Sequence, residues 1–129
     1  MKLKVTLIIA AIYMALIGIG HLISPIAVSA GVIPADASTG LISFVRHYSA
    51  LFISLAVLNW MARNQEPSTA LNAIIYANLV AFGLAAILDV FAVINGAGVV
   101  GLAPATMNLV IAAVIFWASR TSATSKKAS

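Results

Sequence analysis

Five polar side chains that could do chemistry lie inside otherwise apolar stretches of this sequence. They are His21, Arg46, His47, Asp89 and Asn108. A charged group in an apolar environment needs a partner of opposite charge or a set of hydrogen bonds. Because Arg46 and Asp89 carry opposite charges, we expect them to form an ion pair whose hydrogen bonds the other three residues complete. These five residues are the predicted ligand-binding site.

Several kinds of chemistry suit these residue types. The imidazoles of His21 and His47 could ligate a haem b, but Arg46 beside one ligand suits this only if it pairs with a propionate. Asp89 or a histidine could instead pass protons to a bound quinone. The chain has no cysteine, which excludes disulfides, thiolate metal sites and thiol redox chemistry. We expect no metal site. As a possible cofactor, a quinone suits these residues better than haem b. No motif in the sequence assigns an enzyme reaction.

The composition indicates which environment these residues occupy. Of 129 residues, 63% are hydrophobic and only 8% are charged, whereas in a soluble domain roughly a quarter of the residues are charged. The surplus apolar surface must face a bilayer. The net charge of +4 comes from scattered basic residues rather than from one patch, so nucleic acid is not an expected partner. The sequence predicts an all-α integral membrane protein.

Four apolar segments are long enough to form the membrane spans, since about 20 residues cross a hydrocarbon core. The prolines fall in or beside the connections between them, where a missing N–H does least harm. The predicted architecture is a four-helix bundle over residues 1–120, followed by a disordered cytoplasmic tail over 121–129. The predicted spans are 5–23, 41–62, 71–94 and 102–118.

The basic residues predict the orientation. With four spans, the connections at the opposite end contain only Asp36 as a formal charge, and basic residues favour the cytoplasmic side. We therefore expect a multi-pass protein of the cell inner membrane with both termini cytoplasmic. The first segment also resembles a signal peptide with a cleavage site after Ala30, but its length favours an uncleaved span. The basic residues that predict the cytoplasmic side are Lys2, Lys4, Arg63, Arg120, Lys126 and Lys127.

The candidate site residues share one level in the membrane. With a rise of 1.5 Å per residue, His21, Arg46, Asp89 and Asn108 lie about 6–9 Å inside the outward ends of their spans. This predicts a polar layer in the outer third of the bundle. Three structural roles that need no ligand stay open as alternatives. Arg46 could extend to the lipid headgroups, the two histidines could lie at the membrane interface, and Asn108 could serve only to hydrogen-bond one helix to another.

Two short motifs resemble a known family. The segment Gly18-Ile19-Gly20-His21-Leu22-Ile23-Ser24-Pro25 at the end of the first span, and Trp60-Met61-Ala62-Arg63 at the end of the second, resemble the DoxX-like superfamily of small four-helix bacterial membrane proteins. The resemblance implies a four-helix bundle with a polar pocket toward one membrane face. It also implies kinship with subunits of quinone-linked oxidoreductases and with proteins that assist membrane-protein assembly.

Three functions are compatible with these features. The first is an outward-side polar pocket that binds a small amphipathic ligand, such as a quinone or a lipid headgroup. The second is a structural accessory subunit or assembly factor of a larger membrane complex. The third is catalysis, with proton transfer to a bound quinone. The expected partners are membrane lipid and either a membrane-protein partner or further copies of this chain.

Overall fold

The computed structural model describes residues 2–29 and 32–125, and within them it contains helices and no strand. Four of the helices are long and apolar enough to cross a membrane, judged by their length and composition. The prediction of an all-α protein with four membrane-length helices is confirmed. The elements are α1 (Leu3–Ile23), α2 (Pro25–Val28), α3 (Thr39–Ala62), α4 (Thr69–Ala92), the π-helical turn η1 (Val93–Ala97), the 3₁₀ turn η2 (Val99–Gly101) and α5 (Leu102–Ser125).

Serine caps decide where α3 and α4 begin. The Ser38 hydroxyl oxygen accepts a hydrogen bond from the Leu41 backbone N–H at 3.3 Å, and the Ser68 hydroxyl oxygen accepts one from the Leu71 N–H at 3.1 Å. A side-chain acceptor at this position satisfies a backbone donor that has no partner within the helix. Both helices therefore begin before the apolar runs that start at residues 41 and 71.

The last helix extends further than the sequence suggested. Residues 121–125, predicted to belong to a disordered tail, continue α5 as helix. The Thr121 hydroxyl donates to the backbone oxygens of Trp117 and Ala118, at 3.2 and 3.1 Å. A hydroxyl that bonds back to the preceding turn is compatible with helix, so a polar composition does not by itself end it. The remainder of the predicted tail, 126–129, lies outside the described residues.

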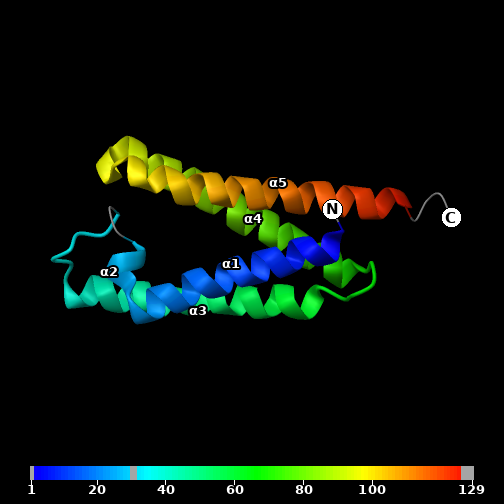
Figure 1. The fold of residues 1–129 in the computed structure, drawn as a ribbon, viewed down its shortest axis with the longest axis horizontal. Coiled ribbons are helices and arrows are strands. Elements are labelled where there is room, and N and C mark those ends of the chain that lie inside the picture. Colours follow the sequence, from blue (N-terminus) through cyan, green and yellow to red (C-terminus); the bar gives the residue numbers. More distant parts are fainter. Residues whose placement is uncertain (1, 30–31, 126–129) are drawn as a thin grey trace.

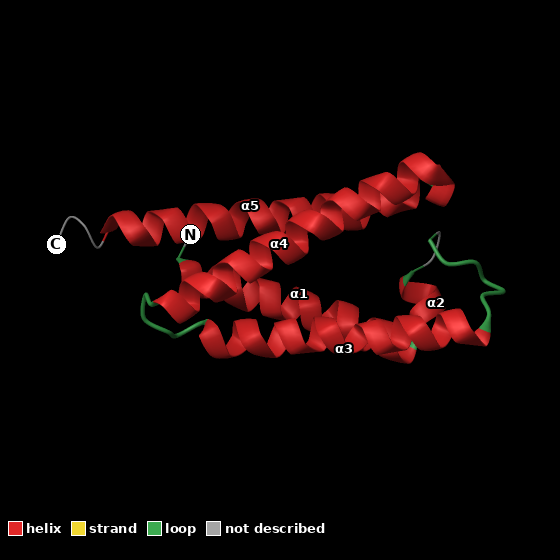
Figure 2. Ribbon diagram, turned by 180° about the vertical axis from the view of Figure 1, so that it is seen from behind, coloured by secondary structure: helices red, strands yellow, loops and turns green. Residues whose placement is uncertain are grey.

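The membrane-length helices form two pairs, in which α1 packs along α3 and α4 packs along α5 (Figure 1). The start of α1 and the end of α5 lie at one end of the bundle, here called the terminal end. The connection that contains α2 and the turn between α4 and α5 lie at the opposite end, the loop end. The two pairs meet near the terminal end and diverge toward the loop end (Figure 2).

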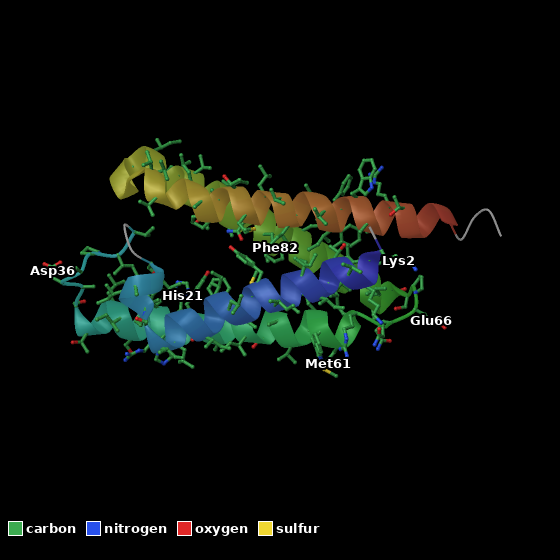
Figure 3. The ribbon with its side chains drawn as sticks, viewed as in Figure 1. Lys2, His21, Asp36, Met61, Glu66 and Phe82 are labelled. Atoms are coloured by element: carbon green, nitrogen blue, oxygen red, sulfur yellow. The ribbon has the colours of Figure 1, made fainter. Side chains whose placement is uncertain are left out.

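The apolar core lies where the two pairs meet. Leu7 of α1, Phe82 of α4 and Ile115 of α5 are each at most 1% exposed. Phe82 lies centrally between the pairs (Figure 3), and its ring centroid is 6.2 Å from that of Tyr13 on α1. Helix α3 packs mainly on α1, and α4 packs mainly on α5, so α3 and α4 contact each other little. The space between α3 and α4 is therefore open toward the loop end.

One glycine determines how closely α1 approaches α3. A Cβ atom added at Gly18 would lie 2.8 Å from Cγ1 of Ile53 and 3.1 Å from its backbone nitrogen. Such distances are too short for a real side chain, and small residues of this kind let membrane helices pack backbone against backbone. The close approach also places the end of α1, including His21, against Phe52 of α3.

Candidate functional site

Asp89 lies on α4 at the open end of the bundle, and a chain of hydrogen bonds holds it. The side-chain amide Nδ2 of Asn108 on α5 donates to Asp89 Oδ2 at 3.0 Å. The Tyr13 hydroxyl on α1 donates to Asn108 Oδ1 at 3.3 Å. Asn108 is 8% exposed, so its amide is fixed between the two other groups. The carboxylate is therefore oriented by residues of three helices, and its second oxygen, Oδ1, has no hydrogen-bond partner among the described residues.

His21 is held from both sides of its ring. Its Nδ1 lies 2.8 Å from the backbone oxygen of Ile17, and its Nε2 lies 3.0 Å from the Ser29 hydroxyl. A carbonyl oxygen can only accept, so Nδ1 carries a hydrogen, and in the neutral ring Nε2 accepts from Ser29. The ring also stacks on Phe52, with 5.7 Å between centroids. His21 thus forms part of a wall, since neither ring nitrogen is free to ligate.

The predicted ion pair between Arg46 and Asp89 is not formed. Arg46 is exposed on α3 and lines neither of the two cavities that Asp89 lines. Among the described residues, the side chain that binds the carboxylate is the neutral amide of Asn108. The physical reason is that a long arginine side chain can extend toward the interface, whereas burying a guanidinium costs more than burying an amide.

His47 also stands apart from the other candidates. It is exposed, and its Nδ1 donates to the Ser43 backbone oxygen one turn earlier, at 2.8 Å. It lines neither cavity next to Asp89. Of the five predicted site residues, the structure brings together His21, Asp89 and Asn108 and leaves Arg46 and His47 outside. No group of three His, Asp or Glu side chains in the described part of the chain could hold a metal ion.

Two cavities meet at Asp89. The larger, of about 770 Å³, runs between α3 and α4 and is called the α3–α4 groove. The smaller, of about 310 Å³, lies at the loop end and is called the loop-end cavity. They share Tyr48, Phe52 and Asp89. The groove is otherwise lined mainly by aliphatic side chains: Leu51, Leu55 and Leu58 of α3, and Leu84, Ala85 and Leu88 of α4.

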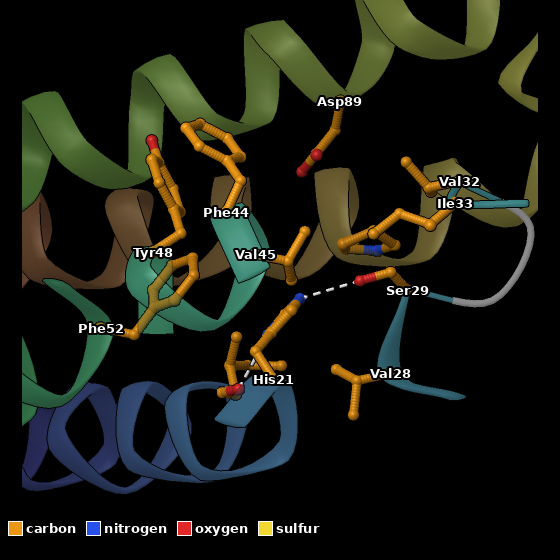
Figure 4. Close-up of a pocket in the computed structure, with 12 residues that line it drawn as sticks. His21, Val28, Ser29, Val32, Ile33, Phe44, Val45, Tyr48, Phe52 and Asp89 are labelled. Atoms are coloured by element: carbon orange, nitrogen blue, oxygen red, sulfur yellow. Dashed lines mark hydrogen bonds between the residues drawn. The ribbon is translucent and has the colours of Figure 1, made fainter. Parts of the chain in front are cut away.

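A row of aromatic rings on α3 faces Asp89 across the loop-end cavity (Figure 4). Phe44, Tyr48 and Phe52 are four residues apart, so they lie on one face of the helix. Their centroids are 6.0 Å apart for Phe44 and Tyr48, and 5.7 Å apart for Tyr48 and Phe52. The row continues into the ring of His21. One wall of the cavity is thus aromatic, and the opposite wall carries the carboxylate.

The connection after α1 forms one side of this cavity. Val28, Ser29, Val32 and Ile33 all line it, and the hydrogen bond from Ser29 to His21 ties the connection to α1 (Figure 4). The connection after α1 thus contributes to the loop-end cavity, and the α3–α4 groove lies between two helices with many exposed apolar side chains.

Sequence reasoning missed three parts of this site: Tyr13, the aromatic row on α3 and Ser29. Tyr13 is not among the predicted site residues, because its partner Asn108 lies 95 residues away in the chain and no local pattern connects the two. The aromatic row did leave a signal, because Phe44, Tyr48 and Phe52 repeat every four residues. Ser29 gave no signal, since nothing in a loop sequence shows which helix it folds back to.

Comparison of the chain with protein-family models, with curated proteins and with solved structures finds no match in any of the three. What can be said of its class therefore rests on the fold and the site. By the length and composition of its helices, it is a multi-pass membrane protein built as a four-helix bundle. At one end it holds a carboxylate between two connected, mainly apolar cavities.

Proposed function

We propose that this protein binds a small amphipathic molecule, such as a quinone or a lipid headgroup with its attached chain, around Asp89. The observation that carries the proposal is the junction of the two cavities at one oriented carboxylate. Ligand pockets are typically about 300–1,000 Å³, mainly apolar, with a few placed polar groups. The groove offers a surface for an apolar tail, and Asp89 with Asn108 offers a polar contact for the head.

The route of entry supports an amphipathic rather than a water-soluble ligand. The groove lies between α3 and α4, and a smaller share of these two helices than of α1 and α5 is buried within the protein. Many of their exposed side chains are apolar, including Leu51 and Leu88, which line the groove. In a bilayer this surface faces lipid, so a molecule already dissolved in the membrane reaches the groove without passing through water.

We propose the same orientation that the basic residues favour, with the site near the outward face of a bacterial inner membrane and both termini in the cytoplasm. We also propose membership of the DoxX-like superfamily. The roles of two residues in its motif support this: Gly18 packs against α3 and His21 lines the loop-end cavity.

Native mass spectrometry tests the binding proposal. The protein is extracted gently from its own membrane, and its mass and absorption spectrum are recorded together with those of Asp89→Asn. We expect a retained small molecule on the wild type that Asp89→Asn loses. The matched control is Asp36→Asn, which removes the same charge from an exposed position in the loop-end connection and should retain the molecule.

Two results would overturn the proposal. Equal retention by Asp89→Asn and the wild type would place the ligand elsewhere. A ligand-free protein that travels with a second polypeptide would instead support the accessory-subunit function, in which the polar groups only fix how the helices pack.

A further inference from the structure

The polar part of the proposed site has one formal charge, that of Asp89, and none of the residues that the structure describes supplies a charge of opposite sign next to it. No lysine or arginine lines either the α3–α4 groove or the loop-end cavity among the described residues. Asp89 receives its hydrogen bond from the neutral Asn108, at Oδ2. A carboxylate in a site of low dielectric constant is stabilised most by an opposite charge. A ligand that carries a positive charge would therefore interact with Asp89 more favourably than a neutral one.

The wall opposite the carboxylate also suits a cation. The faces of aromatic rings carry negative charge density, and ammonium groups bind to them, as in sites for quaternary ammonium ligands. Tyr48 and Phe52 line both cavities, and Phe44 continues the row in the loop-end cavity. In Figure 4 these rings and Asp89 lie on opposite sides of the same space.

We propose that the ligand is a cationic amphiphile: an amine or quaternary ammonium head on an apolar tail, which enters from the bilayer. This rests on the proposed function and specifies the ligand's chemistry. The head lies between Asp89 and the Tyr48–Phe52 wall, and the tail lies along the leucines of the groove. A quinone offers only carbonyl acceptors to the carboxylate, and a phosphate-bearing or carboxylate head adds a second negative charge. Both therefore bind more weakly.

The test compares probes that share one tail and differ in the head. Dodecyltrimethylammonium, dodecanol and laurate are titrated calorimetrically into the full chain in neutral detergent micelles, alongside a quinone with a twelve-carbon tail. We expect saturable binding of the ammonium probe, at least tenfold tighter than that of the alcohol or the quinone, and no saturable binding of laurate. Asp89→Asn should lose at least tenfold in ammonium affinity, and Asp36→Asn should keep the wild-type affinity.

A second pair of variants keeps the test decisive if Asp89→Asn does not fold. Tyr48 is half-exposed on α3, so its replacement leaves the core intact. Tyr48→Leu keeps apolar contact but removes the ring, and should weaken ammonium binding several-fold. Tyr48→Phe keeps the ring and should bind as the wild type does. Equal binding by these two variants would overturn the aromatic part of the proposal.

The outcomes separate this inference from the function on which it rests. If the quinone or the alcohol binds as tightly as the ammonium probe, or laurate binds tighter, the cation preference is wrong and the binding function stands. If none of the four probes binds saturably, the binding function fails as well.

Discussion

Asn59 and Asn78 form a reciprocal pair of hydrogen bonds between α3 and α4. Each side-chain amide Nδ2 donates to the Oδ1 of the other at 2.8 Å, and both residues are 0% exposed. Asn78 Nδ2 also donates to the Ile74 backbone oxygen at 2.8 Å. Because both side chains are buried in an apolar core, neither can replace the hydrogen bonds of the pair with hydrogen bonds to water. The pair fixes α3 against α4 beside the closed end of the groove.

We expect the two asparagines to be energetically coupled. Asn59→Ala and Asn78→Ala each leave a buried amide or carbonyl group unpaired, whereas the double variant removes both groups, so the two losses should not add. Hydrogen bonds between membrane helices give coupling energies of about 0.6 kcal/mol, up to about 1.7 kcal/mol. Unfolding of the four proteins by dodecyl sulfate in mixed micelles, followed by circular dichroism, measures this coupling.

The control cycle pairs Asn59→Ala with Asn72→Ala, since Asn72 is exposed on α4. These two effects should add. If the effects of Asn59→Ala and Asn78→Ala were additive as well, the two asparagines would not be energetically coupled.

The pairing of α1 with α3 depends on the absence of a side chain at Gly18. An added Cβ would meet both a side chain and the backbone of α3, and a well-packed interior does not adjust to such contacts without cost. The same approach stacks His21 on Phe52. One glycine thus connects the packing of two helices to the shape of the loop-end cavity.

We expect Gly18→Ala to destabilise the protein by about 1–3 kcal/mol, the usual cost of overpacking a core. It should also weaken ligand binding, because α1 must move away from α3. The matched control is Gly83→Ala on α4, where an added Cβ meets nothing within 4 Å. Alanine there should be neutral or stabilise by up to about 1 kcal/mol, since glycine is unfavourable within a helix. Thermal unfolding in detergent compares the two, and equal melting temperatures for both variants would refute the close-packing argument.

The ends of the bundle differ in charge. At the terminal end, the Arg63 guanidinium lies 3.9 Å from the ring centroid of Trp60 and donates to its backbone oxygen. At the same end, the Arg120 guanidinium lies 4.6 Å from the ring centroid of Phe116. The loop end carries Asp36 at its tip (Figure 3). Paired aromatic and basic side chains are typical of a membrane–water interface.

The lack of native cysteine allows a clean test of orientation. We expect Asp36→Cys to react with a membrane-impermeant maleimide in intact bacterial cells, because the proposed orientation places the loop end outside. Gln65→Cys, in the connection between α3 and α4, should react only after the membrane is permeabilised. Labelling in the reverse pattern would mean that the termini face outward, and the proposed location of the site would be wrong.

The sequence by itself determined the number of membrane-length helices, and it predicted a common level for the polar residues. Composition and segment length set the number of spans, because a hydrocarbon core requires about 20 apolar residues per crossing. The constant rise of a helix then predicts the depth of each residue in the membrane, and this assigns His21, Asp89 and Asn108 to one level.

Only the tertiary structure decided which of those residues meet. Depth says nothing about direction around the helix axis, so Arg46 and His47 shared the level of Asp89 and still face elsewhere on α3. The helix pairing depends on contacts such as that of Gly18 with Ile53, whose partner no local pattern reveals. That pairing, and the divergence of the two pairs, brought Tyr13 to Asn108 and opened the groove beside Asp89.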